Sequence, residues 1–248
     1  MVASSREKAY SYIPKKYEVS HSSSYLHLTS NNTIEGTEIF DFPQSQIPVV
    51  CDMSSDIFSR KLDVSQFDLI YAGAQKNMGP AGMTLVIAKN AFLDSVNTTL
   101  PSMSDYRIFR ASQSMYNTPP VFSIYVAMLN LEWLRNLGGV EAIEIRNIAK
   151  ADLLYRELDS SSIFSASVNG PDRSRMNVTF SANHPDTEAG FLEYATQRGL
   201  IGIKGYRTVG GFRVSLYNAL SIESVQTLVR HMKEYEKIVE EKLNTVIA

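Results

Sequence analysis

The sequence contains few residues of the kinds that mark secretion, membrane insertion or nucleic-acid binding. Cys51 is the single cysteine in 248 residues, so no disulfide can form within the chain. The net charge is only -2, and the lysines and arginines are dispersed, which excludes the massed basic surface of a nucleic-acid-binding protein. No segment approaches the roughly 20 apolar residues of a membrane span, and the first residues lack an apolar signal core. We therefore expect a cytoplasmic protein without a membrane anchor or a nucleic-acid partner.

Enough apolar residues are present to build a core, since hydrophobic residues make up 44% of the chain. Short apolar segments in the first half alternate with polar turns that contain glycine and proline. The pattern predicts strands at residues 25–28, 48–51, 69–72 and 83–88. Such spacing favours an α/β fold with a mainly parallel sheet, which binds its ligand at the carboxyl ends of the strands.

The second half is richer in helical periodicity. A long helix is expected at 121–137, after a Pro-Pro pair and before Gly138-Gly139. Strands and helices then alternate, which predicts a smaller α/β domain over 138–248, after a larger domain over 1–137. The elements expected there are helices at 140–158, 187–198 and 222–243 and strands at 176–180 and 213–217.

Lys76 follows an apolar strand and begins a loop of small residues. Most lysines are exposed, but one near a buried strand end is partly desolvated, which favours the neutral amine that forms an imine with a carbonyl compound. Asp52 ends another predicted strand. If the two strands are neighbours in a parallel sheet, both side chains emerge at one edge, where an aspartate can keep a pyridine nitrogen protonated. The alternative for Asp52 is an ordinary turn former or helix cap.

Six segments closely resemble the phosphoserine aminotransferase family, in the same order along the chain. The resemblance runs from residue 2 to the C-terminus, and the combination is far more specific than any one segment. The segments are Ser30-Asn-Asn-Thr-Ile-Glu-Gly36, Cys51-Asp-Met-Ser-Ser-Asp-Ile-Phe-Ser-Arg60, Tyr71-Ala-Gly-Ala-Gln-Lys-Asn-Met-Gly-Pro-Ala-Gly82, Met115-Tyr-Asn-Thr-Pro-Pro120, Arg173-Ser-Arg-Met-Asn177 and Gly205-Tyr-Arg-Thr-Val-Gly-Gly-Phe-Arg213.

The resemblance implies a fold-type I, class V pyridoxal 5'-phosphate aminotransferase that acts as a homodimer. It implies transfer of an amino group between O-phospho-L-serine and 2-oxoglutarate in serine biosynthesis. It leaves open whether the related phosphohydroxythreonine step of vitamin B6 synthesis, which bacterial members of the family share, is also catalysed. No metal is implied. Lys76 would bind the cofactor aldehyde and move a proton, and Asp52 would pair with the pyridine nitrogen.

Further binding residues follow from the same resemblance. Thr33 and Gln75 would contact the cofactor, and Asn117 and Thr118 would reach the cofactor phosphate of the neighbouring subunit. The alternative for the segment that contains Asn117 is a plain helix start capped by Thr118, and the two interpretations are compatible.

Arg207 and Arg213 suit a substrate with two anionic groups, because guanidinium groups bind carboxylates and phosphates through paired donors. By resemblance, Arg213 would take the α-carboxylate and Arg207 would help to bind the side-chain anion. Tyr206 stands where the family often has histidine, and its hydroxyl can still donate to the substrate phosphate.

The resemblance also predicts that the chain is N-terminally truncated. Family members have about a hundred further residues before the segment that matches Val2, including a glycine-rich loop and an aromatic that stacks on the cofactor. We expect Trp133 to pack in the core and not to replace that aromatic. Two alternatives remain: another fold-type I enzyme, such as a desulfurase or a different transaminase, and a non-catalytic fragment that only dimerises or binds a partner. Cys51 lies within a predicted strand, which counts against a desulfurase.

Overall fold

The computed structural model describes residues 1–168 and 170–247. The chain divides into two compact units, each with its own core. Unit 1 contains residues 1–17, 31–40 and the chain from 141 onward, and unit 2 contains residues 18–30 and 41–140. None of the helices in the described ranges is long and apolar enough to span a membrane.

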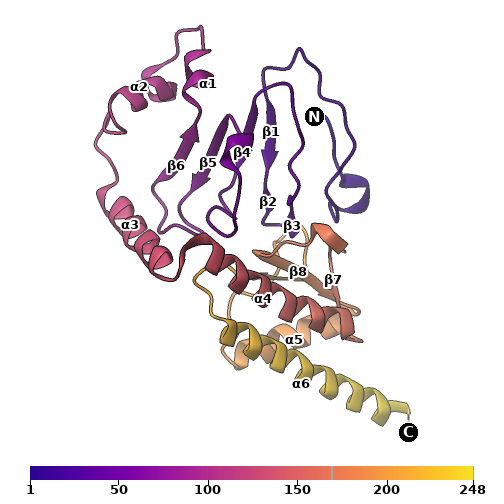
Figure 1. The fold of residues 1–248 in the computed structure, drawn as a ribbon. Helices are drawn as coiled ribbons and strands as arrows, with labels where there is room; N and C mark the ends of the chain where they lie inside the picture. The colour runs from indigo at the N-terminus through magenta and orange to yellow at the C-terminus, as the bar shows by residue number, and fades with distance from the viewer. Residues whose placement is uncertain (169, 248) are drawn as a thin grey trace. The chain divides into compact units, whose positions relative to one another are not determined.

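Unit 2 is built on a four-stranded sheet, in the order β1 (Leu26–Thr29), β4 (Val49–Asp52), β5 (Leu69–Gly73) and β6 (Thr84–Ala88) (Figure 1). The pairs β1–β4 and β4–β5 are parallel, and β6 runs antiparallel to β5. The four strands expected in this part of the sequence are therefore confirmed to within one residue at each end, and the sheet is mainly parallel.

The two faces of this sheet differ, because successive side chains of a strand point to opposite sides. Val49 and Cys51 of β4 pack with Ile70 and Ala72 of β5 in a buried core. Asp52 and Tyr71 alternate with these residues and are only half-buried. Asp52 and Tyr71, together with His27 and Thr29 of β1, form the open face of the sheet.

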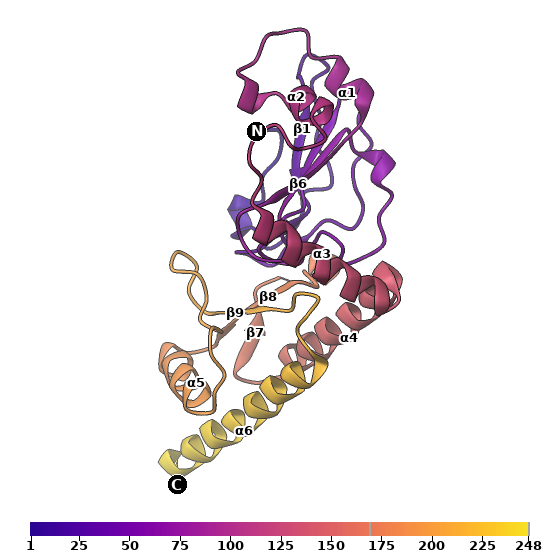
Figure 2. The ribbon, with the colours of Figure 1, turned by 90° about the vertical axis from the view of Figure 1, so that its left-hand side faces the viewer.

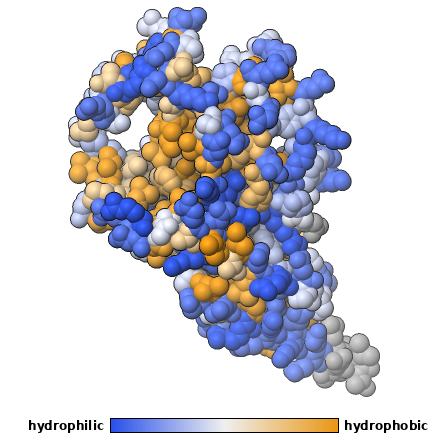
Figure 3. All heavy atoms as spheres, in the orientation of Figure 1, coloured by the Kyte–Doolittle hydropathy of each residue, from blue (hydrophilic) through white to orange (hydrophobic). Residues whose placement is uncertain are grey.

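The other elements of unit 2 are short, apart from one helix. They are η2 (Val64–Gln66), α1 (Asn90–Asp94), η3 (Ser102–Ser104), α2 (Tyr106–Ala111) and α3 (Val121–Asn136). Helix α3 confirms the expected long helix, but it buries few side chains. Phe122 at 73% and Val121 at 67% are among its exposed apolar residues. Figure 3 shows further apolar surface on the visible face of this unit.

Unit 1 contains a three-stranded antiparallel sheet, in the order β7 (Phe164–Ala166), β8 (Asn177–Ala182) and β9 (Phe212–Ser215). Helices α4 (Gly139–Ser160), α5 (Pro185–Gln197) and α6 (Ile222–Ile247) pack with it (Figure 2). The short elements are η1 (Arg6–Lys8), η4 (Gly170–Asp172) and the pair β2 (Asn31–Asn32) and β3 (Thr37–Glu38). The later elements confirm the expected alternation of strands and helices, and β7 was not expected.

The core of unit 1 is organised around phenylalanine rings from four elements. Phe164, Phe180, Phe191 and Phe212 are each no more than 2% exposed. The Phe164 and Phe191 rings meet edge to face at 4.8 Å, and the Phe180 and Phe212 rings stack at 4.9 Å. These contacts join the sheet to α5, and such aromatic pairs each contribute about 1 kcal/mol beyond the burial of their area.

Candidate active site

Asp52 and Lys76 lie at the same edge of the sheet in unit 2. Asp52 ends β4, and Lys76 follows the end of the adjacent parallel strand β5. The Gly73 amide donates to Ser54 Oγ at 3.0 Å, which ties the end of β5 to the turn after β4. The side chain of Lys76 is half-buried in a turn that is closed by the Gly79 amide on Ala74 O at 2.8 Å. This arrangement brings an acid and a primary amine to one sheet edge.

The Asp52 carboxylate has a turn-forming role, because its Oδ1 accepts from the Ser54 amide at 2.8 Å. This is the alternative that an isolated aspartate after a strand suggests. The two roles are compatible, since a carboxylate has two oxygens and about four acceptor positions. The half-exposed side chain therefore retains capacity to bind a cationic N–H group.

A buried polar cluster supports the turn that contains Asp52. The Ser30 hydroxyl lies against both the Asp56 carboxylate and Asp52 O, and the Ser30 amide donates to Asp52 O at 3.0 Å. The Arg60 guanidinium lies 3.6 Å from Asp56 Oδ2. Burial raises the pKa of Asp56, and its contacts with Ser30 and Arg60 oppose that rise. This cluster was missed from the sequence, where only the i, i+4 spacing of Asp56 and Arg60 could have signalled it.

The remaining predicted residues of unit 2 lie near strand and helix ends. The Gln75 side chain is exposed and folds over Gly73, where an added Cβ would lie 2.5 Å from Gln75 Oε1. Asn117 and Thr118 are exposed in the loop before α3, and Asn117 Nδ2 donates to Thr118 O at 3.0 Å. Pro120 is the N-cap residue of α3 without a side-chain cap, so the suggested capping by Thr118 is wrong.

Tyr206 and Arg207 lie on the turn of a tight hairpin in unit 1. The Gly205 amide donates to Gly211 O at 2.8 Å, and the Gly210 amide donates to Tyr206 O at 2.8 Å. A Cβ on Gly205 would lie 1.9 Å from Gly210 O, so only glycine allows this closure. Both side chains on the turn are exposed.

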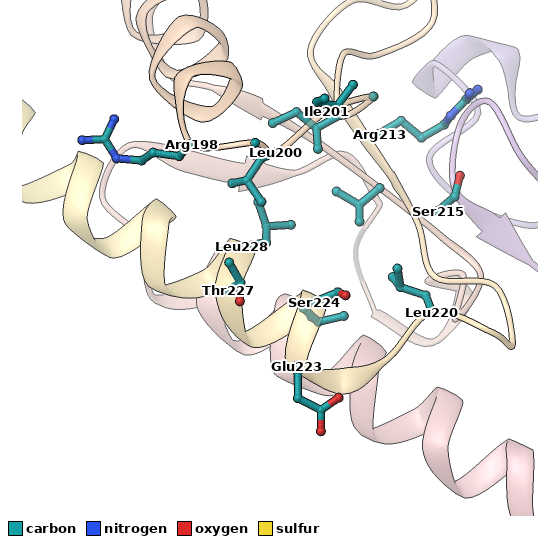
Figure 4. Close-up of a pocket in the computed structure, with 15 residues that line it drawn as sticks. Arg198, Leu200, Ile201, Arg213, Ser215, Leu220, Glu223, Ser224, Thr227 and Leu228 are labelled. Carbon is teal, nitrogen blue, oxygen red and sulfur yellow. The ribbon is translucent and has the colours of Figure 1, made fainter.

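Arg213 lies on β9, immediately after that hairpin. Its guanidinium carbon is 6.0 Å from the centre of the Tyr206 ring, so the structure brings these two predicted residues together. Arg213 also borders a cavity of about 590 Å³ between the 198–203 segment, β9 and α6. Leu200 and Leu228 line that cavity, and Figure 4 shows the Arg213 guanidinium directed away from them. The charged end therefore does not point toward these two leucines.

Thr33 lies in the turn between β2 and β3 of unit 1 and is half-buried. Gly36 closes this turn with φ of +83°, and an added Cβ would lie 2.7 Å from Thr179 Oγ1. The predicted residues therefore belong to two groups, which are Thr33, Tyr206, Arg207 and Arg213 in unit 1 and Asp52, Gln75, Lys76, Asn117 and Thr118 in unit 2.

Two further residues bear on the alternatives. The Cys51 thiol is fully buried in β4, and burial raises its pKa to about 12, which makes it a poor nucleophile. Trp133 is 38% exposed on α3, so the expectation that it packs in the core was wrong.

The side chains of unit 2 fit pyridoxal phosphate by their chemistry. An amine and a carboxylate share one sheet edge, and the open face beside them is half-exposed and carries Tyr71 and Gly73. Asp52 would hold the ring nitrogen and Lys76 the aldehyde carbon.

Comparison with known proteins identifies what this chain is similar to. A family model described as aminotransferase class-V matches residues 7–228. The phosphoserine aminotransferase of Flavobacterium psychrophilum is 55% identical over 95% of this chain and 66% of its own length. That of Azobacteroides pseudotrichonymphae is 52% identical over 96% of this chain and 67% of its own length. This chain thus spans about two thirds of the length of these curated relatives.

Solved structures give the same result. The phosphoserine aminotransferase from Bacillus circulans subsp. alkalophilus superimposes with a TM-score of 0.92 at 41% identity, over 95% of this chain and 66% of that one. A pyridoxal-phosphate-bound phosphoserine aminotransferase from Trichomonas vaginalis matches with a TM-score of 0.83 at 38% identity, over 88% of this chain and 62% of that one. The expected fold-type I architecture is confirmed.

Proposed function

Because this chain belongs to the class-V aminotransferase family, we propose that the protein transfers an amino group between O-phospho-L-serine and 2-oxoglutarate, with pyridoxal phosphate as cofactor. The reverse direction uses 3-phosphohydroxypyruvate and L-glutamate, and the step belongs to serine biosynthesis. The observation that carries the proposal is the shared edge of Asp52 and Lys76, in a chain 55% identical to a phosphoserine aminotransferase.

Bound pyridoxal phosphate supplies a protonated ring that withdraws electrons from the substrate carbon. Asp52 keeps the ring nitrogen protonated, because an ionised carboxylate stabilises a neighbouring cation. Lys76 would hold the cofactor aldehyde. Its amine would also move a proton at the substrate carbon as a general base and acid.

The substrate's two anionic groups are assigned to the hairpin and strand of unit 1. Arg213 takes the α-carboxylate, and Arg207 and Tyr206 contact the phosphate. The contact between Arg213 and Tyr206 supports this assignment, because it places a guanidinium and a phenol hydroxyl on one surface.

The cofactor's remaining contacts are assigned to Thr33 and Gln75, with Asn117 and Thr118 reaching the phosphate of the partner subunit in a homodimer. Two observations support a dimer: Asn117 and Thr118 are exposed, and the adjacent helix α3 exposes Phe122 and further apolar side chains. The protein would act in the cytoplasm, with cofactor chemistry in residues 1–137 and a smaller domain in 138–248.

A titration with pyridoxal phosphate, followed by borohydride reduction and peptide mapping, tests the cofactor assignment. We expect a saturable visible band and a single label at Lys76. Labels scattered over exposed lysines, or no band, would contradict the assignment.

A panel of amino donors tests the substrate assignment. Phosphoserine should be used far better than serine, alanine or cysteine, because a site with two guanidinium groups requires two anions. Equal use of serine would contradict the assignment. Release of sulfide from cysteine would favour a desulfurase instead. The buried Cys51 thiol counts against that alternative.

A further inference from the structure

His27 and Tyr71 contact each other on the open face of the sheet, beside Asp52. The Tyr71 hydroxyl lies 3.0 Å from His27 Nε2, and the two ring centres are 6.0 Å apart. His27 belongs to β1 and Tyr71 to β5, so this contact crosses the intervening strand β4, where Val50 pairs with His27 and Asp52 pairs with Tyr71. The three residues lie within unit 2.

The sheet register places Asp52 directly beside Tyr71. Asp52 pairs with Tyr71 across β4 and β5, and residues paired in a parallel ladder project to the same face. Burial raises the pKa of the Tyr71 hydroxyl, and the charge and hydrogen bond of Asp52 raise it further, with smaller effects from Cys51 and Tyr106. The pairing therefore places the Tyr71 side chain on the same face as the Asp52 carboxylate, on the adjacent strand.

One arrangement of hydrogens links all three residues of this group. A carboxylate accepts hydrogen bonds, and the Tyr71 hydroxyl can donate its single hydrogen to Asp52, which is paired with it across β4 and β5. The hydroxyl oxygen can then accept from His27 when the imidazole hydrogen is on Nε2. The result is a chain of donors from His27 through Tyr71 to Asp52.

We propose that Tyr71, oriented by His27, is the positioning residue that holds the Asp52 carboxylate toward the ring nitrogen of the cofactor. The inference rests on the proposed function and adds two residues that do not touch the reacting atoms. Without the Tyr71 hydroxyl, the carboxylate keeps its bond to the Ser54 amide and turns more freely toward solvent. Its hydrogen bond to the ring N–H group is then weaker.

The test uses Tyr71→Phe, which removes one oxygen and keeps the ring. With ¹⁵N-labelled pyridoxal phosphate bound at Lys76, the ring nitrogen should lose its proton at a pH about one unit lower in this variant than in the unmodified protein. The dissociation constant of the cofactor should rise about tenfold, which corresponds to ~1.4 kcal/mol. A merely structural role would not move the ring-nitrogen signal.

A second pair of variants tests His27. His27→Leu removes the donor and should shift the ring-nitrogen midpoint in the same direction as Tyr71→Phe. His27→Gln keeps an N–H donor on an exposed residue and should restore most of the unmodified behaviour. These substitutions on an exposed strand position preserve the fold, which circular dichroism checks.

Tyr25→Phe is the matched control, because Tyr25 is 53% exposed just before β1. It should leave the midpoint and the dissociation constant unchanged. An unchanged midpoint in Tyr71→Phe, a shift to higher pH, or an equal shift in the control would overturn the inference while leaving the proposed function intact. Failure of the unmodified protein to take up the cofactor at Lys76 would instead overturn both.

Discussion

Asp52 and Tyr71 occupy paired positions on adjacent parallel strands, and Lys76 follows Tyr71 by five residues. Backbone hydrogen bonds between these strands hold the acid and the amine at one sheet edge. The geometry of those bonds depends little on the surface loops. The contacts of Ser30 with Asp52 O and with the Asp56 carboxylate stabilise the turn that follows β4. A site built in this way owes its geometry to rigid elements, which favours precise orientation of a bound ring.

Lys76→Ala should abolish the borohydride label and lower the rate of amino transfer by about 10²- to 10⁴-fold, the usual range for loss of a general acid-base. Steady-state assays with phosphoserine and 2-oxoglutarate measure the rate. Lys89→Ala is the control, because Lys89 is exposed and pairs with Asp68 at 3.1 Å. Retention of the label in Lys76→Ala would show that another lysine holds the cofactor.

Arg213→Lys should raise the KM for phosphoserine about tenfold, because an ammonium keeps the charge but loses the paired donors of the guanidinium. Cofactor binding should not change. Arg146→Lys, at an exposed position on α4, is the comparison. Equal KM values for the two variants would remove Arg213 from the substrate site.

Gly205→Ala should open the hairpin that carries Tyr206 and Arg207, because the new Cβ would lie 1.9 Å from Gly210 O. The free energy of unfolding should fall by about 2 kcal/mol or more. Gly202→Ala is the control for backbone strain without a clash, since Gly202 has φ of +82° and open space beside it. This substitution should lower the free energy of unfolding by only about 1 kcal/mol. Chemical denaturation measures both, and similar losses would argue against the clash.

Phe122→Asp should lower the mass of the assembled protein measured by light scattering, because it places a charge on an apolar surface of α3. Ile145→Asp is matched, since Ile145 is 70% exposed on α4, and it should leave the mass unchanged. A mass unaltered by Phe122→Asp would exclude this part of α3 from the subunit contact.

Lys150 predicts a pH dependence of stability. It is 1% exposed, its Nζ donates to Leu216 O at 2.8 Å and to Tyr217 O at 2.9 Å, and burial lowers its pKa to about 8 from 10.5. Between these two pH values the unfolded chain binds more protons than the folded protein, so the free energy of unfolding should rise with pH, by roughly 3 kcal/mol at most.

Denaturation of the unmodified protein between pH 7.5 and 10.5 should show this rise, and Lys150→Met should remove it. Lys150→Met should also lower stability at the alkaline end of this range, because no charge is buried there in the unmodified protein and two buried carbonyls lose their donor. A parallel pH profile in the variant would mean that other groups cause the dependence.

Sequence by itself determined most of the longer helices and strands and showed which polar residues follow them. Short apolar runs bounded by polar turns located β4 and β5, because a largely buried strand is a short continuous apolar segment in the sequence. The small residues around Lys76 and the terminal position of Asp52 indicated a site at a sheet edge, and their roles there stay predictions. The glycines of the 205–211 segment indicated close backbone approach for the same local reason.

Only the tertiary structure decided which side chains meet across elements. The contact of His27 with Tyr71 spans 44 residues, and that of Ser30 with Asp56 spans 26, so neither follows from local spacing. The register of β1, β4 and β5 decides both, because it is set by the packing of the whole sheet. The exposure of Trp133 depended likewise on what packs against α3, a property that the helix's own periodicity does not contain.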